Sequence, residues 1–294
     1  MTDTFDYIIV GAGSAGCVLA DRLTANGRHR VLLLEAGGSD RRFFVQMPLG
    51  YGKTFYDKSV NWMYQAEPDP GLNGQRDYYP RGKLLGGSSS VNAMVYIRGH
   101  QADYEDWKAA GNVGWGWDEV LAAYKAMEGY AEGDPAYRGL GGPLTITDLG
   151  EQAHPLCKPY LEATEKAGLK HTPDFNGAEQ EGVGLYQFTI KGGIRNSAAR
   201  AFLRPAMKRK NLKVETNAQA TNIIFEGNRA VGVAYVQNGQ SLKVRGREVI
   251  VSGGAINSPQ LLQLSGIGPG ALLQSLGIPV VKDNANVGAK MQDH

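Results

Sequence analysis

Two continuous apolar runs near the start of the chain, residues 7–10 and 31–34, are separated by a helical apolar pattern over residues 17–23. Parallel strands that are covered on both faces show such unbroken apolar runs, whereas an amphipathic helix repeats apolar positions every three to four residues. The pattern therefore predicts a strand, a helix and a second strand, which is the beginning of an α/β sheet.

The second half of the chain changes to short runs of β-branched and apolar residues separated by Gly and Asn. These runs predict a small antiparallel meander whose last strand rejoins the main sheet through residues 249–251. The predicted strands are 212–215, 220–225, 230–236, 241–244 and 248–252, and the predicted helices are 118–128, 155–167 (interrupted at Pro159), 196–207 (capped by Asn196 or Ser197) and 260–264.

Composition narrows the classes of function. Lys and Arg outnumber Asp and Glu by only two residues. The chain therefore has no strong positive electrostatic field that would attract nucleic acid. The two cysteines, Cys17 and Cys157, exclude a disulfide framework and a four-thiolate zinc site, and they favour a cytoplasmic location. The uncharged stretch 7–20 is too short to cross a bilayer, so we expect no transmembrane segment.

A glycine motif connects the first predicted strand to the first helix, with Gly11, Gly13 and Gly16 in the spacing GxGxxG. In this pattern the first glycine allows a tight turn, the second lets a pyrophosphate approach the backbone, and the third lets the helix pack on the strand. Glu35 ends the second strand, where an acidic side chain accepts hydrogen bonds from a ribose. The motif predicts dinucleotide binding without distinguishing NAD from FAD.

Three further segments each allow two interpretations. The aromatic-rich stretch 43–79 is either an ordered loop packed on the core or a lid over a ligand. Residues 82–99, with two adjacent glycines and three serines, either cradle a polar ligand or cap a helix. The glycines at 253–254 either abut a ligand or only help a helix to pack.

Together, residues 6–38, 82–99 and 254–268 resemble the N-terminal part of the glucose–methanol–choline (GMC) flavin oxidoreductases over essentially the whole chain. The similarity is greatest to bacterial choline dehydrogenases and medium-chain alcohol dehydrogenases. The resemblance implies an α/β fold: an FAD-binding Rossmann-like sheet with a small antiparallel β meander and an incomplete substrate region. It assigns 1–150 and 195–294 to the FAD-binding domain and 151–194 to the start of the substrate region.

The resemblance also implies FAD as the cofactor, with no metal. We expect the FAD to be noncovalent because Val91 stands where some members carry a flavin-linked histidine. The implied FAD-binding residues are Gly11, Gly13, Ser14, Ala15, Gly16, Glu35, Ala36, Arg81, Gly82, Leu85, Gly86, Gly87, Ser88, Asn92, Ala93, Met94, Val95, Ala220, Gly253 and Gly254.

The family oxidises a primary alcohol or choline to an aldehyde, and its catalytic histidine is expected beyond residue 294, in a C-terminal part that this sequence lacks. None of the five histidines, including the terminal His294, matches the catalytic positions. Two hypotheses follow: the FAD-binding half of a truncated alcohol dehydrogenase, or a non-catalytic FAD-binding module that needs a partner chain. The alcohol, the electron acceptor and the oligomeric state stay open. A disulfide reductase is disfavoured because a second GxGxxG motif and a redox cysteine pair are absent.

Overall fold

The computed structural model describes residues 4–292, and the chain divides into two compact units. Unit 1 combines residues 1–92 with 197–294, and unit 2 is Ala93–Asn196. The second boundary lies next to the predicted one at residue 195. The first boundary differs, because residues 93–150 are grouped with the 151–194 segment and not with the glycine motif.

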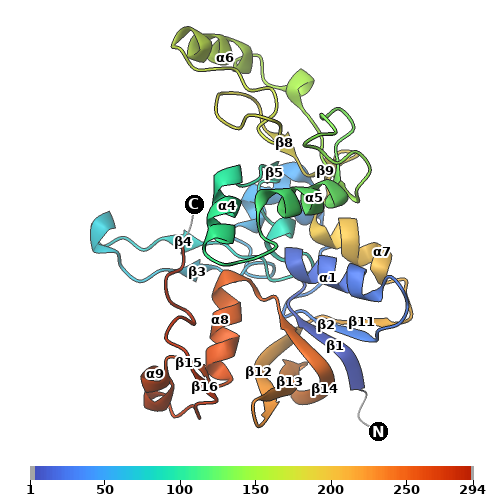
Figure 1. Cartoon of the computed structure of the whole chain (residues 1–294), viewed down its shortest axis with the longest axis vertical. Coiled ribbons are helices and arrows are strands. Elements are labelled where there is room, and N and C mark those ends of the chain that lie inside the picture. Colours follow the sequence, from blue (N-terminus) through green and yellow to red (C-terminus); the bar gives the residue numbers. More distant parts are fainter. Residues whose placement is uncertain (1–3, 293–294) are drawn as a thin grey trace. The chain divides into compact units, whose positions relative to one another are not determined.

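Unit 1 is built on a six-stranded mixed sheet with the order β11-β2-β1-β14-β13-β12. The two apolar runs form the parallel pair β1 and β2, and the predicted fold class is confirmed. Figure 1 shows β14 between β1 and β13. The strands are β1 (Thr4–Val10), β2 (Val31–Leu34), β11 (Leu212–Glu215), β12 (Ala218–Glu226), β13 (Arg229–Gln237) and β14 (Gln240–Val251).

Two strand predictions are wrong. The runs 241–244 and 248–252 are one strand, β14, whose first half pairs antiparallel with β13 and whose second half pairs parallel with β1. Gly246 does not break it, because the absence of a side chain there makes room for Ile8: a Cβ would lie 2.8 Å from Ile8 Cδ1. Residues 212–215 are outside the meander, since β11 pairs parallel with β2.

Helices of unit 1 pack on this sheet. Helix α1 (Ser14–Thr24) packs against β1 and β2, and α8 (Gly254–Leu264) packs against β12. Leu261 of α8 joins Ile8, Val10 and Leu34 in the main core. Helix α8 begins six residues before the predicted start and contains Pro259. The glycines that precede it therefore lie at its N-terminus.

The predicted helix 196–207 is only partly regular. Ser197 Oγ accepts the Arg200 N–H at 3.3 Å, which supports the predicted cap. A π-helical turn, η5 (Ala199–Leu203), then leads into the short α7 (Arg204–Ala206). Pro205 lies in the first turn of α7, where a backbone N–H has no intrahelical partner.

The other elements of unit 1 are short. They are α2 (Phe43–Gln46), η1 (Pro48–Gly50), α3 (Tyr51–Thr54), β3 (Tyr64–Gln65), η2 (Pro70–Leu72), β4 (Tyr78–Tyr79), η3 (Gly87–Ser90), β15 (Ile267–Gly268), α9 (Gly270–Ser275) and β16 (Lys282–Asp283). Strands β3 and β4 form an antiparallel hairpin, and β15 pairs parallel with β16.

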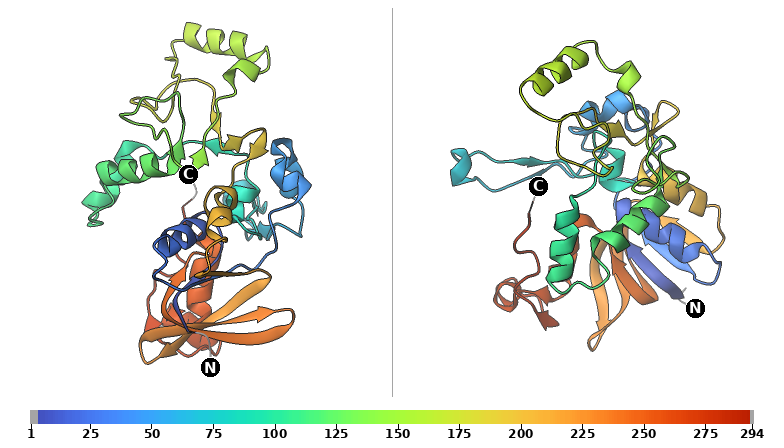
Figure 2. Two further views of the ribbon diagram at one scale, coloured as in Figure 1. Left: turned by 90° about the vertical axis from the view of Figure 1, so that its right-hand side faces the viewer. Right: turned by 45° about the horizontal axis from the view of Figure 1, so that its top comes forward.

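Unit 2 consists of short pieces. They are β5 (Val95–Tyr96), α4 (Gln101–Ala109), α5 (Trp117–Met127), β6 (Glu128–Gly129), β7 (Leu144–Thr145), η4 (Gly150–Gln152), α6 (Cys157–Lys166), β8 (Gln187–Phe188), β9 (Ile190–Lys191) and β10 (Ile194–Arg195). Within this unit α6 lies away from α4 and α5 (Figure 2). Pro159 does not interrupt α6, because it lies in the first turn, where a backbone N–H has no intrahelical partner.

A buried ionic cluster holds unit 2 together. Glu128, with a fully buried side chain, lies between the guanidinium groups of Arg98 and Arg138. Its Oε1 accepts from Arg138 Nε at 2.9 Å, and its Oε2 accepts the Gly139 N–H at 3.0 Å. Arg138 Nη1 lies 2.7 Å from both oxygens of Asp174. Arg98 and Arg138 also lie over the rings of Tyr124 and Tyr130. Charged side chains, which a sequence pattern normally places at the surface, therefore form part of the interior of unit 2.

Candidate functional site

The glycine motif forms the tight turn that its spacing predicts. Gly11 has φ +100°, and a Cβ there would lie 2.5 Å from the Ser252 carbonyl oxygen at the end of β14. A Cβ at Gly16 would lie only 1.9 Å from the Gly11 carbonyl oxygen. Ser252 Oγ donates to the Gly11 carbonyl at 2.8 Å and fixes the turn from the other side. The conformational tasks predicted for Gly11 and Gly16 are confirmed.

A second glycine segment packs against this turn. The Gly86 N–H donates to the Ala12 carbonyl at 2.7 Å. A Cβ at Gly87 would lie 2.7 Å from the Gly13 Cα, so the two glycines let the backbones touch. Gly13 itself differs, because a Cβ there would meet nothing within 4 Å. Gly13 therefore faces open space, as expected of the position that a ligand approaches.

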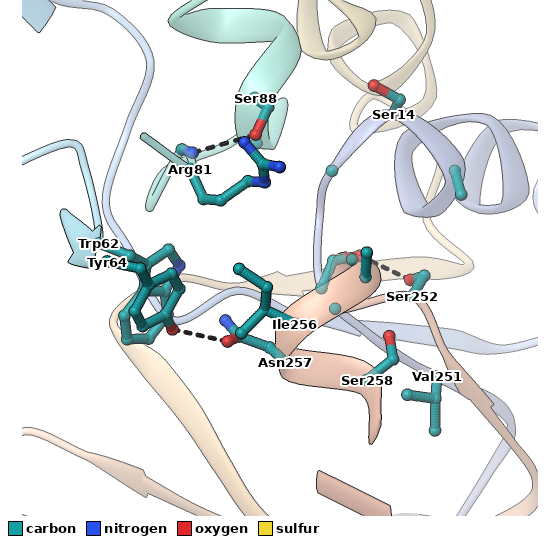
Figure 3. A pocket seen from close by; sticks show the side chains of 18 of the residues that line it. Ser14, Trp62, Tyr64, Arg81, Ser88, Val251, Ser252, Ile256, Asn257 and Ser258 are labelled. Atoms are coloured by element: carbon teal, nitrogen blue, oxygen red, sulfur yellow. Dashed lines mark hydrogen bonds between the residues drawn. The ribbon is translucent and has the colours of Figure 1, made fainter. Parts of the chain in front are cut away.

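Two adjoining cavities of about 480 and 380 Å³ lie along this glycine framework. Gly11, Trp62, Gly253 and Asn257 line both. The N-termini of α1 and α8 border the larger cavity, which Figure 3 shows from close by. Free N–H groups and the helix dipole make a helix N-terminus favourable for anions, and here two such ends face one cavity. The larger cavity therefore suits an anionic group of a ligand.

An aromatic pair closes one wall of the larger cavity. The rings of Trp62 and Tyr64 stack with their centroids 5.8 Å apart, and Lys83 Nζ lies 4.4 Å from the Trp62 ring centroid. The Tyr64 hydroxyl donates to Asn257 Oδ1 of α8 at 2.6 Å (Figure 3). Aromatic enrichment over 43–79 was the sequence signal for this wall, but the bond joins residues 193 positions apart. The packed-loop interpretation of that stretch is supported, because Val45 and Val60 are core residues. Trp62 and Tyr64 line the cavity, and the lid stays a prediction.

The predicted cofactor residues fall into three groups. Those that line the two cavities are Gly11, Gly13, Ser14, Ala15, Ala36, Arg81, Gly82, Gly87, Ser88, Ala220, Gly253 and Gly254. Gly16, Glu35, Leu85 and Gly86 shape the backbone around them. Asn92 is exposed in unit 1, and Ala93, Met94 and Val95 belong to unit 2. Lining residues that the prediction missed include Trp62, Tyr64, Gln219, Thr221, Asn257 and Ser258.

Glu35 is buried and holds the glycine turn in place. Its Oε2 accepts the Ala12 N–H at 2.8 Å, and its Oε1 accepts the Gly37 N–H at 2.9 Å. Burial raises the pKa of Glu35 to about 7, although these two N–H groups and the charge of Lys83 act in the opposite direction. Each carboxylate oxygen keeps a further lone pair beyond these two bonds.

We expect this buried carboxyl to make stability depend on pH. Because its pKa rises from 4.5 to about 7 on folding, its contribution to stability is full below pH 4.5 and is lost as the pH rises to about 7. The shift corresponds to about 3 kcal/mol. Glu35→Gln removes the titration, so the urea midpoints at pH 5 and pH 8 should lie closer together than in the wild type. An unchanged difference between the two midpoints would contradict the assignment.

Over residues 4–292, no group of three or more His, Cys, Asp or Glu side chains is arranged to hold a metal ion. No helix in the same range has the length and apolar character that a bilayer crossing requires. His294 lies outside the described residues.

Comparisons with known proteins agree with this geometry. The chain is 49% identical to an alcohol dehydrogenase [acceptor] of Pseudomonas putida, over 99% of this chain and 53% of that protein. It is 50% identical to the human mitochondrial choline dehydrogenase, over 99% of this chain and 50% of that protein. An FAD-dependent oxidoreductase from Chaetomium thermophilum superposes with a TM-score of 0.89 at 30% identity, covering 96% of this chain and 51% of that one.

The chain thus spans about half the length of the curated relatives it matches. The family model for GMC oxidoreductases matches residues 5–294, which is nearly every residue of the sequence. The chain belongs to the GMC oxidoreductase family.

Proposed function

We propose that this chain binds FAD noncovalently in the two cavities and forms the cofactor-binding part of an oxidoreductase that converts a primary alcohol or choline to an aldehyde. Family membership and the relatives named alcohol and choline dehydrogenase support the reaction class. The structural relative named as FAD-dependent supports the cofactor. When bound, FAD supplies a hydride acceptor for the carbon that carries the hydroxyl.

The single observation that carries the proposal is the cavity bordered by two helix N-termini and lined by glycines without side-chain cover. A Cβ at Gly13 or Gly254 would meet nothing within 4 Å, so both positions leave space where a bulky group would otherwise stand. Backbone N–H groups of α1 and α8 suit a pyrophosphate, and Arg81 adds a cation to the lining. The smaller cavity, lined by Ala36 and Ala220, adjoins the larger one and suits the adenosine. The residues present fit FAD.

Noncovalent binding is supported by the surroundings of Val91. Its side chain is buried in a small apolar cluster with Val45, Val60 and Leu84. Valine has no nucleophile, so this position cannot form a bond to the flavin ring. Thr54 Oγ1 approaches the Val91 carbonyl at 3.4 Å and helps to fix the segment.

The cavity linings favour a second candidate, a non-catalytic FAD-binding module that needs a partner chain. Removal of the hydroxyl proton needs a base with a pKa near neutrality. Among the described lining residues, Tyr64 and Arg81 are the ionisable ones, and burial raises the pKa of Tyr64 further above 10. Neither is suited to accept the proton, so the base must come from residues outside this lining.

The visible spectrum of the purified chain tests both candidates. We expect yellow protein with about one flavin per chain, and we expect acid precipitation to release the flavin into the supernatant. A colourless chain that takes up no added FAD would overturn the proposal, and flavin retained on the precipitated peptide would overturn noncovalent binding. Oxidation of choline or an alkanol with an artificial electron acceptor would then exclude the non-catalytic module.

Two finer assignments complete the proposal. We assign residues 151–194 to the substrate side; like the rest of unit 2, they contribute none of the lining residues of the two cavities. The free thiols of Cys17 and Cys157 suit a reducing compartment such as the cytoplasm, although the human relative is named as mitochondrial.

A further inference from the structure

Asn61 is a buried amide in unit 1 that directly precedes the stacked aromatic pair of the larger cavity. The residue is 3% exposed, and both ends of its amide form hydrogen bonds. Oδ1 accepts the Met63 N–H at 2.9 Å and the Arg81 N–H at 3.0 Å. Nδ2 donates to the carbonyls of Thr54 at 3.3 Å and Phe55 at 3.1 Å. One short side chain therefore connects three stretches of backbone.

The turn that Asn61 supports has an unfavourable backbone conformation. Met63 has φ +55°, in the left-handed region that residues with a side chain rarely adopt. Its neighbours Trp62 and Tyr64 are the stacked pair that lines the larger cavity (Figure 3). A conformation of this kind persists only when surrounding contacts enforce it. The hydrogen bond from the Met63 N–H to Asn61 Oδ1 is such a contact.

Asn61 also fixes the neighbouring part of the cavity lining. It forms an antiparallel bridge with Gly82, and next to this bridge the Trp62 N–H donates to the Arg81 carbonyl at 2.9 Å. Trp62, Arg81 and Gly82 line the larger cavity. Asn61 itself is not among the described residues that line either cavity. It therefore supports lining residues without belonging to the lining.

We propose that Asn61 is a positioning residue for FAD, because its side chain holds the turn at Met63 so that Trp62 and Tyr64 form the cavity wall before the cofactor binds. A site whose binding conformation is only partly populated binds its ligand more weakly in proportion to that fraction. Support of the turn therefore raises affinity without a contact to the ligand. This inference rests on the proposed function, since FAD is the ligand that the wall is expected to meet.

The affinity of the full 294-residue chain for FAD, measured by flavin fluorescence, tests this role. Asn61→Ala should raise the dissociation constant about tenfold. It should also change the visible circular dichroism of the bound flavin. Adding Met63→Gly should restore most of the affinity, because glycine adopts a positive φ without support. Adding Met63→Ala should not restore it, although nearly the same side chain is removed.

Asn211→Ala is the matched control in the same unit. Asn211 Nδ2 likewise donates to two carbonyls, those of Thr24 at 3.2 Å and His29 at 2.8 Å. None of these three residues is among the described residues that line the cavities. Asn211→Ala should therefore lower the urea midpoint and leave the dissociation constant for FAD unchanged.

Three results would overturn the proposal: wild-type affinity in folded Asn61→Ala, equal recovery with Met63→Gly and Met63→Ala, or an affinity loss as large in Asn211→Ala. If Asn61→Ala does not fold, Met63→Val tests the same turn with Asn61 in place, because a β-branched residue resists a positive φ. Folded Met63→Val should bind FAD about tenfold more weakly than Met63→Gly, and equal affinities would count against the role of Asn61. A wild-type chain that takes up no FAD would overturn the proposed function itself, an outcome that differs from all of these because no substitution is needed to produce it.

Discussion

Gly13→Asp is expected to abolish flavin binding while leaving the sheet of unit 1 folded. Gly13 has φ −74°, which any residue adopts, and a Cβ there meets nothing within 4 Å. The new side chain would extend into open space beside the N-terminus of α1 and place a carboxylate where a pyrophosphate is proposed to lie. Loss of the space and repulsion between like charges should together raise the dissociation constant for FAD more than about 100-fold, or about 3 kcal/mol.

Titration of the apoprotein with FAD, followed by flavin fluorescence, measures this effect. Gly141→Asp is the matched control, because Gly141 likewise has nothing within 4 Å of its Cβ position but lies in unit 2. Gly16→Ala should behave differently from both, since its Cβ would lie 1.9 Å from the Gly11 carbonyl oxygen and must disturb the turn itself. Retention of near wild-type affinity by folded Gly13→Asp would place the flavin elsewhere.

The parts of the fold that the sequence predicts are those in which local pattern and global position agree. The runs that became β1 and β2 are buried on both faces, and the glycine turn between them has few alternative conformations. Gly246 shows the opposite case: a glycine within a strand indicates a break, but here it provides clearance for Ile8 on the neighbouring strand. That distinction depends on a pairing partner about 240 residues away, which no local pattern contains.

In the candidate site, too, some residues are predictable from local sequence, whereas others depend on tertiary packing. Glycine spacing locates Gly11, Gly13 and Gly16 because backbone conformation is a local property. Family resemblance added Ala36 and Ala220, which line the smaller cavity. The hydrogen bond from Tyr64 to Asn257 had no local signal, since each residue alone is an ordinary aromatic or amide position. Closure of the cavity wall is a product of tertiary packing.

The interior of unit 2 was not predicted from the sequence, because buried charges contribute to it. Hydrophobic periodicity identifies a core only where the buried residues are apolar. Glu128, Arg98 and Arg138 have side chains that are no more than 1% exposed, yet each reads as a surface residue in the sequence. Their burial is tolerable because each charge meets an opposite charge and neutral hydrogen-bond partners.

Glu128→Gln should therefore destabilise unit 2 by about 3–5 kcal/mol. The neutral side chain leaves two guanidinium groups without the carboxylate that lies between them. Arg138 keeps its contacts with Asp174 at 2.7 Å, while Arg98 keeps a bond to the Tyr137 carbonyl at 2.7 Å. A buried cation whose charge partner is removed costs far more than an exposed one, because water cannot replace the lost partner.

Tryptophan fluorescence during urea unfolding measures this change selectively, since Trp107, Trp115 and Trp117 lie in unit 2 and Trp62 lies in unit 1. Glu226→Gln is the matched control: its pair with Arg245 is exposed at 61% and 49% of the side chains, and its loss should cost at most about 1 kcal/mol. Arg98→Gln combined with Glu128→Gln should be less destabilising than the sum of the two single changes, because the double variant removes the unpaired charge together with its partner. Equal, small effects of Glu128→Gln and Glu226→Gln would show that the cluster is hydrated and does not form the interior of unit 2.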